Sequence, residues 1–359
     1  MIVISPKWIY THNNKLETDK SILIDGPIIL DIVDNETVEK SYKEISRIKY
    51  SKHILMPTFT ECYYDTNECL NINDIESKMM SLLKCGVTRL CAHNNNYKDL
   101  MSANIEQLDI GYIIEFDGKT VHQADIKNMT DMFDFHKSDP SKQFCISLNN
   151  IINFDKDTII KLSSIINEID LKLHIKGSCL QNISDKSKIN ELMNFWSEIN
   201  LLDNSYMHGV LSLSNHWMSY IKKNNITVVV SYIELFDIDK MINFFQMLEK
   251  KYKCTLITDT CDSYNLYEVI KVIDRLATKK KNVFDKNQII NCVTKNTSNL
   301  FSNFISTDSI KKGNKASFNL FDYTINQLLK DKSSSPKLSS LDKQSLTHVW
   351  SAGEQLKIQ

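Results

Sequence analysis

Eight short apolar runs between residues 52 and 260 constrain the fold of this chain more than any other feature. Most of them are dense in Ile, Val and Leu without alternation, which is typical of parallel strands buried on both faces. The stretches between them carry apolar residues at helical spacing. Alternating strands and helices predict a parallel sheet, and about eight repeats favour closure into a (β/α)8 TIM barrel over a doubly wound open sheet. The expected strands are residues 53–56, 87–92, 110–114, 144–148, 171–175, 205–208, 226–230 and 255–258, and the expected helices include residues 74–83, 157–169, 186–198, 215–223 and 237–250.

Both ends of the chain differ from this alternating middle part. Short β segments separated by polar turns fill residues 1–50, where Asp25-Gly26 is a hairpin signal, and further strand-like segments lie near the other end of the chain. With 359 residues the chain is long enough for a barrel of about 250 residues and one smaller domain. We therefore predict that residues 1–50 and 305–359 form one small composite β-sandwich and that residues 51–304 form the barrel.

Charge and cysteine content argue against several classes of function. Lys and Arg number 43 against 44 Asp and Glu, so the net charge of -1 provides no field that would attract nucleic acid or a membrane surface. The nine cysteines are scattered without a CxxC pair, which favours a reducing compartment over a disulfide framework. The sequence opens without a secretory signal pattern, and no apolar run approaches the ~20 residues that span a bilayer. We expect a cytoplasmic protein with a small-molecule ligand.

Polar side chains stand at the ends of four expected strands, namely His93, His174, His208 and Asp259. Active sites of (β/α)8 barrels lie where the strands end, so these side chains are expected to face one mouth. Two imidazoles and a carboxylate, from His174, His208 and Asp259, form a set that Zn²⁺ or Fe²⁺ accepts. Each residue also has a structural interpretation, because a histidine at a strand end is often only hydrogen-bonded and Asp259 is placed to cap the next helix. His93 is a candidate ligand contact or part of a polar loop.

Six motifs, in order along the chain, resemble those of the amidohydrolase superfamily, nearest in style to its cytosine deaminase, chlorohydrolase and guanine deaminase branch. They are similar to the run before the strand-one His-x-His pair, the Gly-Val-Thr entry of strand two, the strand-six histidine motif, the strand-eight Thr-Asp motif, the turn back to the small domain and the closing Val-Trp strand. Each motif is weak alone, but their order is specific. The motifs are residues 55–61, 86–90, 206–214, 256–259, 310–317 and 348–354.

The resemblance implies an activity and a role for three residues. His174 matches the strand-five metal ligand, and Asp259 matches the strand-eight ligand. His208 matches the histidine that orients or deprotonates the hydrolytic water. The reaction implied is hydrolysis of a C–N bond in a small heterocycle or amide by a metal-activated water, and a homodimer is one assembly that the resemblance implies.

Four positions depart from the family pattern, one of which is Ser317, where an aspartate is usual after Ala316. Tyr63 and Asp65 stand where the strand-one His-x-His pair is expected, and Gly177 stands where the proton-shuttling acid is expected. One hypothesis is an unusual metal site in which Asp65 joins the other ligands and Tyr63 contacts the water or the substrate, which favours a harder metal than zinc. The alternative is a pseudoenzyme with a degenerate active site that binds a ligand or a partner subunit without turnover.

Overall fold

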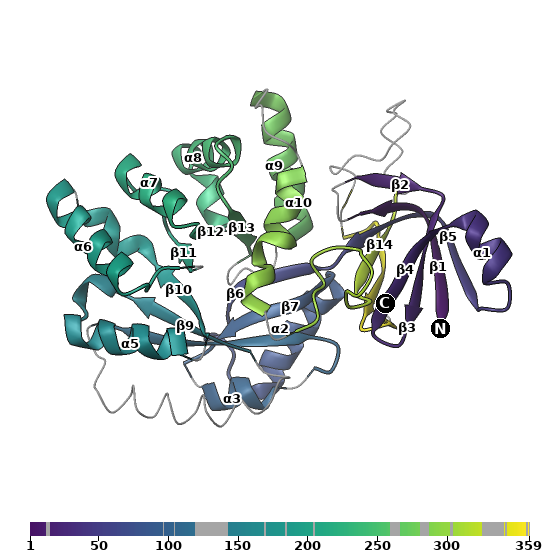
Figure 1. Ribbon diagram of the computed structural model, residues 1–359, viewed down its shortest axis with the longest axis horizontal. Coiled ribbons are helices and arrows are strands. Elements are labelled where there is room, and N and C mark those ends of the chain that lie inside the picture. Colours follow the sequence, from purple (N-terminus) through teal and green to yellow (C-terminus); the bar gives the residue numbers. More distant parts are fainter. Residues whose placement is uncertain are drawn as a thin grey trace.

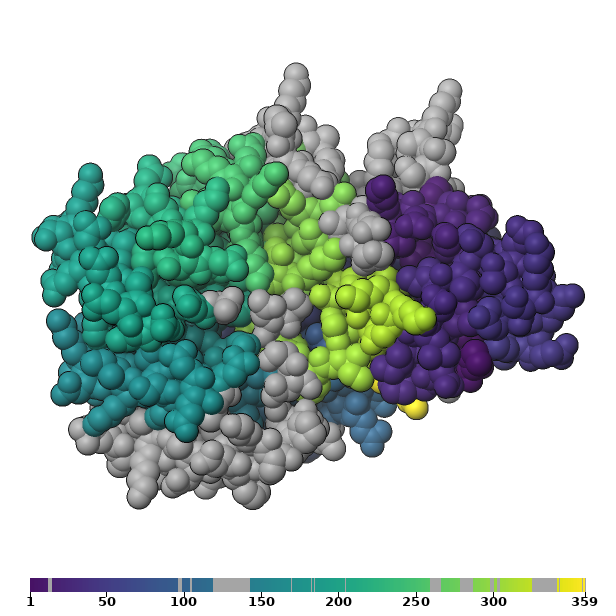
Figure 2. Space-filling view, in the orientation of Figure 1, coloured from purple at the N-terminus to yellow at the C-terminus, as the bar shows by residue number. Residues whose placement is uncertain are grey.

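The computed structural model describes residues 1–11, 15–95, 97–103, 105–118, 143–168, 170–183, 185–203, 205–258, 266–280, 287–301, 304–324, 341, 343–356 and 358. It consists of a parallel eight-stranded barrel with helices around it and a separate mixed sheet (Figure 1). The mixed sheet is built from both ends of the chain, and in Figure 2 its N-terminal strands, coloured purple, gather on one side of the molecule. The predicted fold class is therefore confirmed.

The mixed sheet has the strand order β16-β15-β14-β5-β1-β3-β4, with β2 paired to β1. Its core contains Ile4, Leu55, Phe318 and Trp350. The predicted hairpin at Asp25 and Gly26 joins β3 to β4, and Gly26 has the positive φ of 51° that such turns require. Its strands are β1 (Ile2–Tyr10), β2 (Leu16–Thr18), β3 (Lys20–Asp25), β4 (Ile28–Asp34), β5 (Arg47–Pro57), β14 (Phe318–Asp322), β15 (Leu346–Ser351) and β16 (Glu354–Leu356), with helix α1 (Asn35–Ser41) between β4 and β5.

The barrel strands pair in parallel and in chain order from β6 to β13. They are β6 (Phe59–Asp65), β7 (Val87–His93), β8 (Asp109–Asp117), β9 (Gln143–Asn149), β10 (Lys172–Lys176), β11 (Tyr206–His208), β12 (Thr227–Ser231) and β13 (Cys254–Ile257). The α-helices are α2 (Ile72–Lys84), α3 (Tyr97–Ser102), α5 (Lys156–Glu168), α6 (Lys186–Glu198), α7 (Asn215–Lys223), α8 (Ile238–Glu249), α9 (Leu266–Lys280) and α10 (Asn287–Val293). The 3-10 helices are η1 (Ile151–Asn153), η2 (Gly177–Asn182), η3 (Ile233–Phe236) and η4 (Lys295–Phe301). Among the described residues, no helix is long and apolar enough to cross a membrane.

The first barrel strand is not the one predicted from the sequence. Residues 53–56 lie in β5, which pairs with β1 and β14 of the mixed sheet, and the first barrel strand is β6. The error has a physical cause. As an inner strand of its sheet, β5 is apolar where it is buried, whereas β6 carries Glu61, Tyr63 and Asp65 and so lacks the apolar signature of the other barrel strands. The remaining seven strands agree with the prediction within three residues at each end.

Glu61 connects the first and last barrel strands. Its fully buried carboxylate accepts hydrogen bonds from the backbone N–H of Thr258 at 3.1 and 3.2 Å and from the Thr258 hydroxyl at 2.9 Å. Hydrogen bonds to a charged acceptor are roughly twice as strong as those between neutral groups. No ladder joins β6 to β13 among the described residues, so this carboxylate closes the barrel where strand pairing does not.

A buried ion network lies at the opposite end of the barrel from the carboxyl ends of the strands. Arg89 in β7, whose side chain is 2 % exposed, pairs with Asp109 at the start of β8 through Nε and Oδ2 at 3.3 Å. Its guanidinium also donates to the carbonyl of Ile305 and lies over the ring of Phe301. Lys315 Nζ, in the segment that leads to β14, is 2.6 Å from Asp109 Oδ1. The network fastens the returning chain to the base of the barrel.

Candidate functional site

The carboxyl ends of the barrel strands, called the barrel mouth below, bring three imidazoles around one tyrosine ring. The ring of Tyr63 stacks on that of His174 with a centroid distance of 4.8 Å and an interplanar angle of 17°. It lies 5.9 Å from the ring of His93 and 6.1 Å from that of His208. His174 and His208 are themselves 6.1 Å apart. The predicted site residues from β6, β7, β10 and β11 therefore share one region.

His174 is held as a neutral, buried imidazole. Its side chain is almost fully buried, and its Nδ1 is 3.5 Å from the hydroxyl of Ser147 on the neighbouring strand β9. Burial, assisted by the charges of His208 and Lys176, holds the pKa of His174 well below its ordinary value of 6.5. Its buried Nε2 has no hydrogen-bond partner among the described residues. A neutral imidazole with an unpartnered nitrogen is available to bind a ligand.

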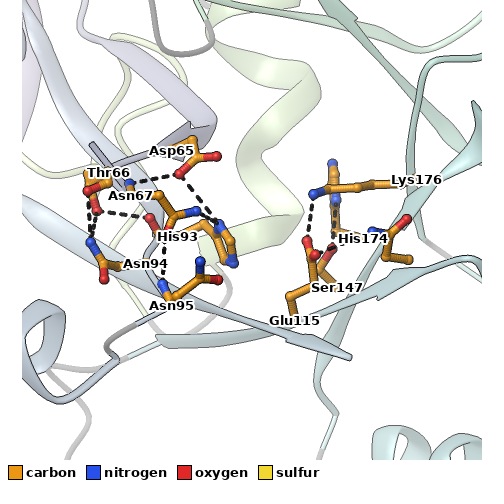
Figure 3. A network of polar contacts seen from close by, with 11 residues as sticks. Asp65, Thr66, Asn67, His93, Asn94, Asn95, Glu115, Ser147, His174 and Lys176 are labelled. Atoms are coloured by element: carbon orange, nitrogen blue, oxygen red, sulfur yellow. Dashed lines mark hydrogen bonds and ion pairs between the residues drawn. The ribbon is translucent and has the colours of Figure 1, made fainter. Parts of the chain in front are cut away.

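A lysine and a glutamate that the sequence did not single out stand beside this stack. Lys176 ends β10, and its Nζ is 2.6 Å from Oε2 of Glu115 on β8 and 5.6 Å from the centroid of the Tyr63 ring. Burial lowers the pKa of Lys176, but Tyr63 and Glu115 outweigh it and raise that pKa overall. Burial raises the pKa of Tyr63 to about 12, so the phenol is neutral near neutral pH. Figure 3 shows the end of Lys176 directed toward the carboxylate of Glu115, beside Ser147 and His174.

Asp65 belongs to a second polar group around His93 (Figure 3). Asp65 Oδ1 is 3.6 Å from Nδ1 of His93 and accepts a hydrogen bond from the backbone N–H of Asn67 at 2.9 Å. Burial raises the pKa of Asp65, but these two partners outweigh it and lower that pKa overall. Asn67 Nδ2 also lies 3.3 Å from His93 Nδ1. The carboxylate thus contacts His93, and its predicted part in a metal site stays a prediction.

A carboxylate also stands beside His208, although the sequence pattern did not indicate it. Glu234 lies in η3, directly after β12, and its Oε2 is 3.8 Å from Nε2 of His208. The same oxygen accepts a hydrogen bond from the backbone N–H of Ser231 at 3.1 Å. This contact fixes the carboxylate at the barrel mouth. A carboxylate next to an imidazole stabilises the protonated form that arises when a histidine takes a proton from water.

Gly177 shows why the family's acid is missing at its usual place. A Cβ built at this position would stand 3.0 Å from the backbone carbonyl oxygen of His208 and close to the Met207 and Val210 side chains. That distance is too short for an ordinary van der Waals contact, so a larger residue requires the strand ends to shift. Glu115, Glu234 and Asp65 are carboxylates that the described residues do place at the barrel mouth.

The described residues do not by themselves fit a divalent metal. Among them, no group of three His, Cys, Asp or Glu side chains is arranged to hold one. His174 and His208 supply two imidazoles, whereas Tyr63 fills the space against His174 and Lys176 adds a positive charge nearby. Asp259, the predicted strand-eight ligand, lies outside the described residues.

Compared by sequence alone, the chain matches no protein-family model and no curated protein. Its structure is similar to those of several hydrolases. An adenosine deaminase from Xanthomonas campestris with bound zinc has a TM-score of 0.76 at 11 % identity, covering 99 % of this chain and 92 % of that one. A guanine deaminase from C. acetobutylicum with bound guanine has a TM-score of 0.75 at 14 % identity, covering 99 % of each chain. A zinc-bound atrazine chlorohydrolase from Arthrobacter aurescens has a TM-score of 0.78 at 10 % identity, covering 99 % of this chain and 95 % of that one.

These likenesses extend over both the barrel and the mixed sheet, because they cover nearly the whole chain. The resemblance to amidohydrolases of the deaminase and chlorohydrolase type, stated from six sequence motifs, is confirmed for the fold. At 10 to 14 % identity the likeness concerns the fold alone, and the chemistry depends on the side chains at the barrel mouth.

Proposed function

We propose that the protein hydrolyses a C–N bond of a small heterocycle or amide at the barrel mouth. The observation that carries this proposal is the pair of histidines, His174 and His208, which lie on adjacent strands with their rings 6.1 Å apart. They match the strand-five and strand-six histidines of the amidohydrolase motifs. The shared fold with an adenosine deaminase and a guanine deaminase supports the same class of reaction.

In this proposal His208 removes a proton from the attacking water. Glu234, 3.8 Å from its Nε2, orients the ring and stabilises the imidazolium that forms. The buried ring of Tyr63, stacked on His174, holds that imidazole in place beside the site of reaction. His174, neutral and with Nε2 unpartnered in the described region, accepts a hydrogen bond from the bound substrate or the water.

A divalent metal such as Zn²⁺ or Fe²⁺ is implied by the fold, since related structures contain zinc. Such a metal would polarise the substrate and acidify a bound water. The described donors do not complete its site, and no step above depends on it. Metal content is therefore measured as a separate quantity in the test.

The test measures ammonia release from adenosine, guanine, cytosine and simple amides, together with elemental analysis of protein purified without chelator. We expect turnover of at least one compound, and a loss of about 10²- to 10⁴-fold in kcat/KM in His208→Ala, which is the usual contribution of a general base. His216→Ala, on helix α7 and hydrogen-bonded to Asn190, is the matched control and should behave as the wild type. No release from any compound, or equal rates in both variants, rejects the proposal.

A second candidate function is binding of a small ligand without turnover. It is favoured by the Tyr63 ring stacked against His174 and by Gly177 in place of the acid. Ligand-induced increases in melting temperature with the same compounds, in the absence of ammonia release, would support it. A tightly held metal at one equivalent, lost in His174→Ala, would count against it.

A further inference from the structure

Lys176 places a cation at the barrel mouth where the fold implies a metal. It follows His174 by two residues on β10, so both side chains leave the strand on the same face. Its Nζ is 2.6 Å from Oε2 of Glu115 and 5.6 Å from the centroid of the Tyr63 ring. That ring is the one stacked on His174. The ammonium and the His174 imidazole therefore both lie close to the Tyr63 ring.

Three features fix the ammonium in this position. The carboxylate of Glu115 forms an ion pair with it, with Nζ and Oε2 2.6 Å apart. The electron-rich face of Tyr63 attracts a cation at this range. About three quarters of the lysine side chain is removed from solvent, since 26 % of it is exposed, so water screens its charge less than on an open surface.

The same features disfavour a divalent ion at the histidines. A metal bound to Nε2 of His174 would meet a fixed positive charge on the same strand, and like charges in a partly buried site repel strongly. The donors that relatives of this type would supply from strand one are replaced by the neutral phenol of Tyr63 and by Asp65, which contacts His93. Tyr63 and Asp65 on β6 and Lys176 on β10 thus all disfavour binding of a divalent metal.

We propose that the ammonium of Lys176, paired with Glu115 and covered by Tyr63, is the resident cation of the barrel mouth and keeps a divalent metal out. This assignment concerns only the cation and holds whether the site hydrolyses its ligand or only binds it. Its test therefore measures metal binding, and its failure is distinguishable from failure of the proposed hydrolysis.

The experiment restores the missing ligands and then removes the lysine. Tyr63→His/Asp65→His is compared with the same protein carrying Lys176→Ala or Lys176→Met in addition, and zinc affinity is measured by equilibrium dialysis and competition with a chromophoric chelator. Removing the lysine charge should raise zinc affinity about 10–100-fold, the range found for groups next to metal ligands. Lys172→Ala is the matched control, since Lys172 pairs with Asp170 at the other end of β10 and its loss should change nothing.

Circular dichroism and melting temperature identify variants that fail to fold, and Lys176→Met keeps the apolar stem of the side chain for packing. Equal zinc affinity with and without Lys176 overturns the proposal. So does a folded triple variant that takes up no zinc, because some other feature then excludes the metal. Stoichiometric zinc at the barrel mouth of the wild-type protein overturns it as well.

Discussion

Replacing Asp109 by asparagine should destabilise the protein far more than removing a surface ion pair. The carboxylate of Asp109 pairs with two cations: its Oδ2 is 3.3 Å from Nε of Arg89, and its Oδ1 is 2.6 Å from Nζ of Lys315. The side chains of Arg89 and Asp109 are 2 % and 9 % exposed. Asparagine keeps the shape of the side chain but removes the charge, so Arg89 stays buried without its paired carboxylate, while the charge of Asp308 still acts on it.

The expected magnitude follows from these distances. At an effective dielectric constant of about 20, two unit charges about 3 Å apart attract by about 5 kcal/mol, so two such attractions are lost. Part of that loss is offset because the neutral amide no longer bears the desolvation cost of a buried charge. Breaking one partner of a buried pair costs about 3–5 kcal/mol in comparable cases, and we expect a loss in this range.

Urea unfolding followed by tryptophan fluorescence measures the effect, with Glu36→Gln as the control. Glu36 pairs with Lys40 on helix α1, where both side chains are more than two thirds exposed, so its loss should cost about 0.3–0.5 kcal/mol. If Asp109→Asn lowers the free energy of unfolding no more than Glu36→Gln does, the buried network does not fasten the chain to the barrel base and the reasoning is refuted.

The paired rings of His53 and His348 in the mixed sheet, 5.8 Å apart, should make the protein acid-sensitive. Burial lowers the pKa of both imidazoles below 6.5, so their contribution to stability is present above that pH and is lost as the pH falls. His348→Phe should therefore weaken the decrease of the urea unfolding midpoint at acid pH. An unchanged dependence of the midpoint on pH contradicts this prediction. Burial raises the pKa of Tyr63 to about 12, so stability is present below pH 10 and is lost as the pH rises toward 12; Tyr63→Phe should reduce that alkaline loss and remove one late-forming phenolate from an absorbance titration. Gly177→Ala should cost about 1–3 kcal/mol, because its Cβ crowds the carbonyl of His208 at 3.0 Å, and a melting temperature equal to that of the wild type would disprove the crowding.

The barrel was predictable from the sequence wherever a strand is buried on both faces. Runs such as residues 228–230 in β12 have no polar position to obscure the apolar signal, and parallel pairing then follows from the helices between them. The first strand was not predictable in this way. Three residues interrupt the apolar pattern of β6. Glu61 closes the barrel, and the side chains of Tyr63 and Asp65 face the barrel mouth.

The candidate site was predictable only in part. His174 and His208 were recognisable because a histidine at the end of an apolar run is unusual. A lysine or glutamate near the end of a strand is usually exposed to solvent. The sequence therefore did not indicate that Lys176 and Glu115 belong to the site. Only the register shows that they meet, since Glu115 lies opposite Ser147 and Ser147 lies opposite His174. Glu234 lies in a short 3-10 turn, which local sequence does not place relative to β11.

The carboxylate that closes the barrel also bears on the order in which the molecule assembles. Glu61 and Thr258 are 197 positions apart, so their contact forms only after the intervening chain is gathered. The entropy of closing a loop of that length opposes the contact until other strands have paired. The contact between β6 and β13 is therefore expected to form last during folding and to open first during unfolding. Interactions made after the rate-limiting step slow unfolding without speeding folding, so Glu61 sets how long the native barrel persists rather than how quickly it forms.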